Sequence, residues 1–322
     1  EQTSSETTAL IKSRLISGNS LLDLTGGFGV DSYYFSKQFK TVIHCEVNAK
    51  LAEIAIHNFT ILQADNVTTK CTDGIEFLKT LKDKFDWIYI DPSRRDTQKN
   101  KKILIEDCSP NISTIQELVF DHCENVLIKM SPMLDISSTL QILKNVSNVY
   151  IVAIKNEVKE LLFHQEKEFQ SEVTINTSNT YSGGTEHFSF KISQEKSAEA
   201  TLNTPKRYLY EPNAAVMKSG GFKLVSEHYK LDKLDINTHL YTSDDLIKDF
   251  PGKTYKINST HPYHKKTLKR LIGGQKANLK TRNFPEKIEA IKKYFKISDG
   301  GDNYLFFTCS LKSKIAIQCQ LA

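Results

Sequence analysis

The chain has 322 residues, 39% of them hydrophobic and 25% charged, which is ordinary for a soluble protein of one large or two average domains. No apolar run approaches the roughly 20 residues of a membrane span, and no signal-peptide pattern is present, which argues against membrane and secreted classes. The net charge of +5 is unevenly spread, since residues 202–322 hold 22 Lys and Arg against 11 Asp and Glu and the rest hold 21 against 27. This asymmetry favours a polyanionic partner for the C-terminal part.

The first half alternates apolar runs with helical patterns. The predicted strands cover residues 20–25, 41–46, 66–71, 85–91, 125–130 and 148–154. The predicted helices lie near residues 29–38, 48–62, 73–81, 111–121 and 135–143. Alternation at this spacing predicts an α/β fold with a Rossmann-like, doubly wound parallel sheet. The pattern weakens after Asn156, and residues 172–177 and 187–193 are typical of a closing antiparallel pair.

The polar stretch 193–206 contains few apolar residues, and we interpret it as a linker. It separates a first domain, residues 1–195, from a smaller α+β domain, residues 202–322. In the second domain we expect helices near 212–227, 262–272 and 285–295, with strands between and after them.

The six cysteines show no CxxC pairing and lie mostly in apolar runs. Such spacing is typical of buried, reduced thiols in a cytoplasmic protein and speaks against disulfides or a zinc site. We therefore expect a cytoplasmic protein without a bound metal.

The stretch "LLDLTGGFGVDS" (21–32) predicts a buried strand that turns sharply through glycines into a helix. It lacks the GxGxxG pattern of dinucleotide sites, and a tight turn without any ligand is the simpler alternative. However, an acidic residue lies at or next to the C-terminal end of each of the first four predicted strands, and these ends face one crevice. These residues are Asp23, Glu46, Asp73 and Asp91.

Four carboxylates would repel the pyrophosphate of a nicotinamide nucleotide. S-adenosylmethionine carries no phosphate and offers a sulfonium, an ammonium, two ribose hydroxyls and an amino group, which suit carboxylate acceptors. The sequence thus favours S-adenosylmethionine as the ligand of this crevice.

The run "DLTGGFG", followed by an acidic residue after each of the next two strands and then "DP", resembles motifs I to IV of class I S-adenosylmethionine-dependent methyltransferases, with Thr25 in place of the first usual glycine. The resemblance implies that Asp23 serves the methionine ammonium, Glu46 the ribose and Asp73 the adenine. A helix N-cap or a solvated acid is the alternative for Glu46 and Asp73. The full predicted cofactor-binding set is Asp23, Thr25, Gly26, Gly27, Gly29, Glu46, Asp73 and Asp91.

The run "IDPSRRD" (90–96) resembles the D/N-P-P-x motif that holds an exocyclic amino group for methylation, with Ser93 in place of the second proline and Arg94 where an aromatic often stacks. This implies a base amino nitrogen as acceptor. The related DPPR enzymes need a thiol nucleophile where this chain has Met130, and we reject that branch. The predicted catalytic residues are Asp91, Pro92, Ser93 and Arg94, and Arg94, Arg95 and Lys129 are predicted to contact substrate.

Nearly the whole chain resembles bacterial methyltransferases with a C-terminal THUMP-like, ferredoxin-like domain, through "EQTSSETTA", "DPSRRD", "IKMSP", "LYEPNAAVMKSGGF" and "GGDNYLFFT" among other runs. The resemblance implies a seven-stranded methyltransferase sheet and methyl transfer to RNA, either tRNA or rRNA. A distant likeness to trimethylguanosine synthases points to a guanine amino group.

The second domain independently indicates nucleic-acid binding, because basic residues near aromatics suit phosphate and base contacts. Solvated helix faces are the simpler alternative. The predicted RNA-contacting residues are Lys265, Lys266, Lys269, Arg270 and Arg282.

Two other functions stay open. The chain could be a protein or small-molecule methyltransferase whose basic domain serves another acidic partner. It could also be a non-catalytic RNA-binding protein that keeps the methyltransferase fold, which the serine at position 93 makes plausible.

Overall fold

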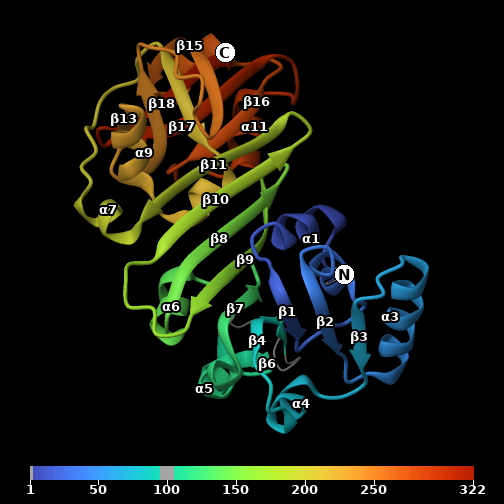
Figure 1. Cartoon of the computed structure of the whole chain (residues 1–322). Coiled ribbons are helices and arrows are strands. Elements are labelled where there is room, and N and C mark those ends of the chain that lie inside the picture. The colour runs from blue at the N-terminus through green and yellow to red at the C-terminus, as the bar shows by residue number, and fades with distance from the viewer. Residues whose placement is uncertain (1–2, 95–104) are drawn as a thin grey trace. The chain divides into compact units, whose positions relative to one another are not determined.

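The computed structural model describes residues 3–94 and 105–322, and the chain divides into two compact units, Glu1–Ser178 and Asn179–Ala322 (Figure 1). This division lies earlier in the chain than the predicted one at residues 195–202. The stretch predicted as a linker contains most of a helix that is hydrogen-bonded to the second unit.

The first unit alternates helices and strands as its sequence predicts. Its elements are α1 (Glu6–Ser13), β1 (Gly18–Asp23), α2 (Val30–Phe35), β2 (Phe39–Cys45), α3 (Ala49–Ile61), β3 (Val67–Lys70), α4 (Gly74–Thr80), β4 (Phe85–Ile90), β5 (Ser93–Arg94), η1 (Ile105–Asp107), β6 (Cys108–Ser109), α5 (Ile112–His122), β7 (Cys123–Met130), α6 (Ile136–Ile142), β8 (Val146–Ile154), β9 (Glu157–Glu166) and β10 (Thr174–Tyr181).

The main sheet has the strand order β11-β10-β8-β9-β7-β4-β1-β2-β3, where β11 spans Gly184–Lys191. The pairs β1–β2, β1–β4, β2–β3 and β4–β7 are parallel, and β9 is antiparallel to β7 and β8. This confirms the predicted α/β fold, with two strands added at one edge of the seven. Sequence analysis missed β9, whose 10 residues follow the turn at Lys155 and Asn156 directly.

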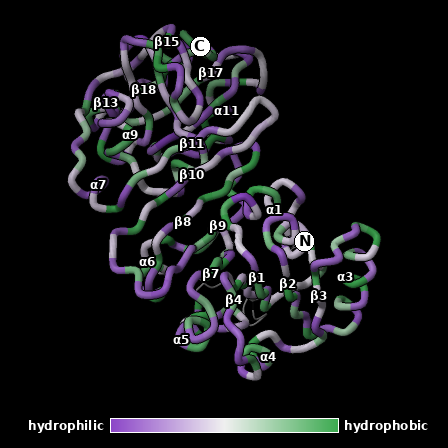
Figure 2. The backbone as a smooth tube through the Cα atoms, viewed as in Figure 1, coloured by the Kyte–Doolittle hydropathy of each residue, from purple (hydrophilic) through white to green (hydrophobic). Residues whose placement is uncertain are grey.

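The apolar positions of this unit meet around the central strands. Phe35 of α2 packs with Leu21, Val42, Trp87 and other buried side chains, and α1 contributes partly buried residues to the same cluster. At the edge, α3 lies beside β3 (Figure 1), and in Figure 2 hydrophobic and hydrophilic residues mix along α3. Trp87 itself stacks on His164 with ring centroids 4.6 Å apart.

The turn between β1 and α2 is shaped by close backbone approach. The amide of Gly26 donates to the Cys45 carbonyl at 2.8 Å, and the amide of Gly29 donates to the Gly26 carbonyl at 3.0 Å. A Cβ on Gly26 would lie 2.0 Å from the buried His44 ring. Gly29 begins α2 with a φ of 79°, a conformation that favours glycine. The turn therefore accepts only glycine at these two positions without strain.

The second unit is α+β, as predicted. Its elements are β11 (Gly184–Lys191), α7 (Ile192–Ser197), β12 (Tyr208–Pro212), α8 (Ala214–Ser219), α9 (Phe222–Tyr229), β13 (Asp232–Asp235), β14 (Thr238–Ser243), β15 (Gly252–Pro262), α10 (Lys265–Ile272), β16 (Asn278–Arg282), α11 (Ile288–Phe295), β17 (Asn303–Ser310) and β18 (Ser313–Leu321). Seven of the strands form a sheet in the order β13-β14-β12-β15-β18-β17-β16.

Two local predictions in this unit differ from the structure. The helix expected near 212–227 is broken into α8 and α9, because Gly220 takes a φ of 77° and ends α8. The stretch 193–206 is not a plain linker, since it includes most of α7. Glu195 of α7 accepts hydrogen bonds from the amides of Lys223 and Leu224 at the start of α9, which fixes this polar helix to the second unit.

The burial of the cysteines follows the sequence analysis at most positions. Cys45, Cys108, Cys123 and Cys319 are buried, whereas Cys71, at the end of β3, is exposed.

Replacing Gly26 with alanine tests the turn. The new Cβ would displace the buried His44 ring, so we expect the free energy of unfolding to fall by about 1–3 kcal/mol. Gly27→Ala is the matched control, because its Cβ would meet no heavy atom within 4 Å and only its φ of 57° opposes the change. Denaturant titration in which Gly26→Ala is no more destabilising than Gly27→Ala would show that the turn is not packed as described.

Candidate functional site

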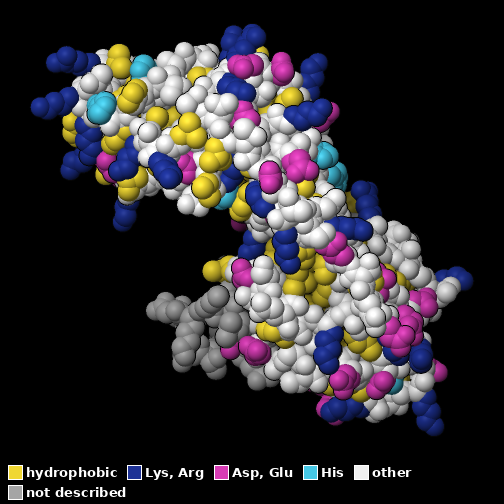
Figure 3. Space-filling view, turned by 90° about the vertical axis from the view of Figure 1, so that its left-hand side faces the viewer, with side chains coloured by type: hydrophobic (Ala, Val, Ile, Leu, Met, Phe, Trp, Pro, Cys, Tyr) yellow, Lys and Arg dark blue, Asp and Glu magenta, His cyan; other side chains and the backbone are white. Residues whose placement is uncertain are grey.

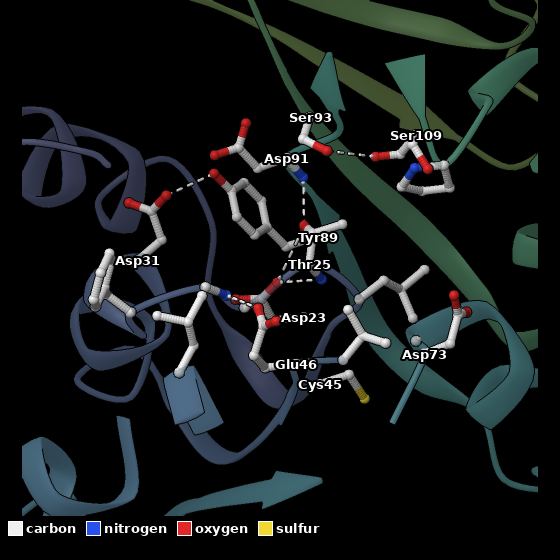
Figure 4. Close-up of a pocket in the computed structure, with 18 of the residues that line it drawn as sticks. Asp23, Thr25, Asp31, Cys45, Glu46, Asp73, Tyr89, Asp91, Ser93 and Ser109 are labelled. Atoms are coloured by element: carbon white, nitrogen blue, oxygen red, sulfur yellow. Dashed lines mark hydrogen bonds between the residues drawn. The ribbon is translucent and has the colours of Figure 1, made fainter. Parts of the chain in front are cut away.

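The ends of β1, β2 and β4 and the start of α4 enclose a cavity of about 430 Å³ (Figure 4). It brings together most of the predicted cofactor residues. Those that line it are Asp23, Thr25, Gly26, Gly27, Glu46, Asp73 and Asp91. Gly29 does not belong to the lining, because it packs on Phe59 at the start of α2 and acts on the shape of the turn.

Asp23 lies at the floor of this cavity and is 1% exposed. Its carboxyl accepts hydrogen bonds from the Ser32 hydroxyl at 2.6 Å and from the Thr25 amide at 3.0 Å. Burial raises the pKa of Asp23 to about 7, and the hydrogen bonds only partly oppose this effect. Nearby His44 supplies no compensating charge, since burial lowers its pKa to about 4.

Glu46 follows β2 and is held by two backbone amides. Gly27 donates to Oε2 at 2.8 Å and Asn48 donates to Oε1 at 2.7 Å. A carboxylate offers about four acceptor positions, so both oxygens keep the capacity to accept a further hydrogen bond. Asp73 caps α4, since its Oδ1 accepts from the amides of Ile75 and Glu76. Asp73 is therefore a helix N-cap, as the alternative proposed. It also lines the cavity, so it can cap the helix and contact a ligand as well.

Thr25, which stands where related sequences usually have glycine, makes a hydrogen bond that glycine could not make. Its hydroxyl accepts a hydrogen bond from the Asp91 amide at 2.6 Å, which joins the end of β4 to the turn after β1. The Asp91 side chain forms an ion pair with Lys129. Lys129, which is predicted to contact substrate, is thus paired with the predicted catalytic residue Asp91, and its contact with substrate stays a prediction.

The remaining residues of "DPSRR" are placed in part. Ser93 and Arg94 form β5, which pairs with Ser109 and Cys108, and the Ser93 hydroxyl donates to the Ser109 carbonyl at 3.4 Å. Pro92 lines a second cavity. Arg95 lies outside the described residues, so its role and the part played by the Arg94 side chain stay predictions.

This second cavity, of about 610 Å³, adjoins the first, and Thr3, Ser4 and Asp91 line both. Its wall contains Lys129 and Glu160, and Glu160 was not singled out from the sequence. Lys12, also missed, is fully buried, and its Nζ lies 2.8 Å from both Glu160 carboxylate oxygens and 3.3 Å from Asp31.

Asp31 extends this network to the cofactor crevice. Its Oδ2 accepts a hydrogen bond from Tyr89 at 2.7 Å (Figure 4). It accepts a second from Ser4 at 2.8 Å. The sequence held one signal for the network, a lysine on the α1 face that also carries the buried Thr8 and Ala9.

In the second unit, the basic residues of α10 are exposed while Leu268 and Ile272 are buried. Leu271, whose spacing also predicts a buried position, is 47% exposed. The ammonium groups of Lys265 and Lys269 lie 5.4 Å and 5.1 Å from the Tyr294 ring centroid. Lys and Arg side chains stand at several places on the face of this unit drawn in Figure 3. Arg282 is separate from this helix and donates to Glu211 at 2.6 Å.

Two parts of the second unit match known domain families. Residues 208–251 match a ferredoxin-like domain, and residues 252–321 match a THUMP domain-like family. Among curated proteins, no sequence matches the chain.

The solved structures that are similar to this chain include one that matches it over its whole length. A protein of Porphyromonas gingivalis W83, described as a "putative methyltransferase", is 32% identical, with a TM-score of 0.91, over 100% of this chain and 82% of that one. A "putative methyltransferase" of Streptococcus mutans in complex with SAH is 14% identical over 50% of this chain and 96% of that one, with a TM-score of 0.36. The latter similarity is too weak to carry an argument.

Within residues 3–94 and 105–322, no helix combines the length and apolarity needed to cross a bilayer. The same ranges contain no group of three or more His, Cys, Asp or Glu side chains arranged to hold a metal ion.

The raised pKa of Asp23 predicts a pH-dependent cost to stability. Between the unfolded pKa near 4 and the folded pKa of about 7, the folded state binds more protons, so stability is lost as the pH rises. Asp23→Asn keeps the shape without the charge. From pH 5 to pH 8 it should gain about 2–3 kcal/mol relative to the parent. Urea titrations of both proteins at several pH values check this, and parallel stability curves would contradict it.

Proposed function

The chain belongs to the class I methyltransferases that carry a C-terminal THUMP-like domain, and we propose that it transfers a methyl group from S-adenosylmethionine to RNA. The observation that carries the proposal is the cavity over Gly27 and Glu46, which opens beside Asp91 to a second cavity.

The residues of the first cavity fit S-adenosylmethionine. A Cβ on Gly27 would meet nothing within 4 Å, so the turn leaves space where the ligand would lie. The Glu46 carboxylate is fixed by two amides and suits a pair of ribose hydroxyls. The same lining contains apolar side chains that suit an adenine ring. They are Val47, Leu51 and Ile75.

Asp91 lines both cavities, so it can contact a methyl acceptor in the second cavity next to the methyl donor in the first. When bound, S-adenosylmethionine supplies an electrophilic methyl group. The chain itself supplies orientation, since the Thr25 hydroxyl fixes the Asp91 backbone and the ion pair with Lys129 fixes its side chain. Holding a reacting group in place in this way is a principal source of catalytic rate.

An RNA substrate is supported by the charge of the second unit and by its THUMP-like match. Exposed basic residues next to an aromatic ring on α10 and α11 suit phosphate and base contacts. A base amino nitrogen as acceptor, cytoplasmic localisation, and the protein-methylating and non-catalytic alternatives stay predictions from sequence.

Replacing Glu46 with alanine tests the ribose contact. Losing charge-assisted hydrogen bonds should weaken binding of S-adenosylhomocysteine by roughly 1.5–3 kcal/mol, measured by calorimetry. Glu53→Ala, at an exposed position on α3, is the control and should bind like the parent. Equal affinity of Glu46→Ala and the parent would remove Glu46 from the cofactor site.

Reversing the charges of Lys265, Lys266, Lys269 and Arg270 to glutamate tests RNA binding. Parent affinity should fall linearly on a log–log salt plot with a slope of about −0.7 per single-strand phosphate neutralised, and the variant should have a flatter slope. The control reverses four exposed lysines of the first unit, which gives the same change in net charge: Lys40, Lys79, Lys82 and Lys84.

S-adenosylhomocysteine affinity should be unchanged in both quadruple variants. If the α10 variant binds RNA as the parent does, RNA contacts another face. If both variants lose binding equally, only net charge matters and α10 is not a specific surface.

A further inference from the structure

Two ion pairs lie beside the second cavity, which Glu160, Lys129 and Asp91 line while Lys12 is buried behind Glu160. Lys12 of α1 pairs with Glu160 of β9, and Lys129 of β7 pairs with Asp91 after β4. The side chains of Lys12 and Glu160 are 0% and 3% exposed, that of Lys129 is 12% exposed and that of Asp91 is 32% exposed. Burying paired charges usually stabilises a fold little or not at all, so stability alone does not account for them.

Most of the residues that line the cavity beside these pairs are polar. Its described lining contains no aromatic side chain, and its apolar members are Pro92, Met130 and Pro132. Hydroxyl side chains form much of the rest, namely those of Thr3, Ser4, Ser5, Thr8 and Ser131. Such a surface offers hydrogen bonds to a sugar and lacks the flat aromatic faces on which a base stacks.

The charge beside Asp91 bears on the atom that is methylated. An amino nitrogen becomes positively charged as it accepts a methyl group, and the Lys129 ammonium next to Asp91 would oppose that charge. A hydroxyl oxygen becomes negative as its proton leaves, and an ammonium at the same place stabilises it. The arrangement therefore favours oxygen over nitrogen.

We propose that the acceptor is a hydroxyl oxygen, namely the ribose 2′-hydroxyl of RNA, held between Lys129 and Asp91. This inference rests on the proposed methyl transfer to RNA and replaces the base amino nitrogen expected from the sequence. The 2′-hydroxyl is the group that each internal nucleotide of RNA has and DNA lacks.

The step balances with the groups present and the methyl donor. The hydroxyl oxygen forms a bond to the methyl carbon, the carbon–sulfur bond breaks with its electron pair going to sulfur, and the hydroxyl proton passes to the Asp91 carboxylate. Lys129 keeps its protons and donates a hydrogen bond to the oxygen. An ammonium has three donors, so the contact with Asp91 leaves others for the substrate.

The protonation of both groups agrees with these roles. Burial raises the pKa of the Asp91 carboxyl above its ordinary value even though Lys129 opposes this, which makes Asp91 a better proton acceptor. Burial lowers the pKa of Lys129, but the carboxylates of Asp91, Asp31 and Glu160 together outweigh it and keep the amine charged.

The position of the methyl group on RNA is the first test. The full-length protein is incubated with methyl-labelled S-adenosylmethionine and total RNA from a strain that lacks the gene. The RNA is then hydrolysed with alkali. Alkaline cleavage of the chain needs a free 2′-hydroxyl, so 2′-O-methylated sites survive as labelled dinucleotides. Nucleoside mass spectrometry should place the methyl on the ribose. Label on a base overturns this inference and leaves the proposed function standing, whereas no label on any RNA overturns both.

Lys129→Met is the second test. Without the ammonium, the rate of single-turnover transfer should fall by about 10²–10³-fold, the scale of losing one oriented electrostatic contact. Calorimetric affinity for S-adenosylhomocysteine should stay within about twofold of the parent. The control is Lys144→Met, an exposed lysine paired with Glu117.

An amino acceptor predicts the opposite result for this variant, because removing the ammonium frees Asp91 to accept from the nitrogen. A parental or faster rate for Lys129→Met therefore overturns the inference, as does equal loss in Lys144→Met.

Discussion

Parallel pairing of β1 with β2 on one side and β4 on the other is the constraint on which the site depends. Asp23 lies opposite His44 of β2 and Tyr89 of β4 in the strand register. The chain therefore leaves all three strands at one edge of the sheet. Glu46 lies two residues beyond His44, and Asp91 lies two residues beyond Tyr89. The glycine turn lies over this edge because its amide bonds to the carbonyl that ends β2.

The site contains several buried ionisable side chains. Asp23 avoids the cost of a buried charge by holding its proton near neutral pH, whereas Lys12, Glu160, Lys129 and Asp91 avoid it by pairing. Removing one member of such a pair leaves an isolated buried charge, which costs more than the pair gains. The network therefore fixes the polarity of the second cavity, and the N-terminal residues Thr3 and Ser4 complete the wall that both cavities share.

Local pattern was enough to predict most strands and helices of the first half, though not α1 or β9, and the convergence of the acidic strand ends. It was not enough where contacts span the chain. Lys12 and Glu160 are 148 residues apart, and no local spacing relates them. The break between α8 and α9 was readable from the Gly220-Gly221 pair, whereas the polar α7 was hidden because its stability comes from Glu195 binding the start of α9.

The single tryptophan of the chain has a consequence for solution work. Trp87 is buried in the first unit and stacked on His164, and the second unit contains no tryptophan. Tryptophan emission will therefore follow the melting of the first unit alone, and an independent transition of the second unit would be spectroscopically silent at that wavelength. Circular dichroism or tyrosine absorbance would be needed to detect it, and disagreement between the two signals would reveal that the units unfold separately.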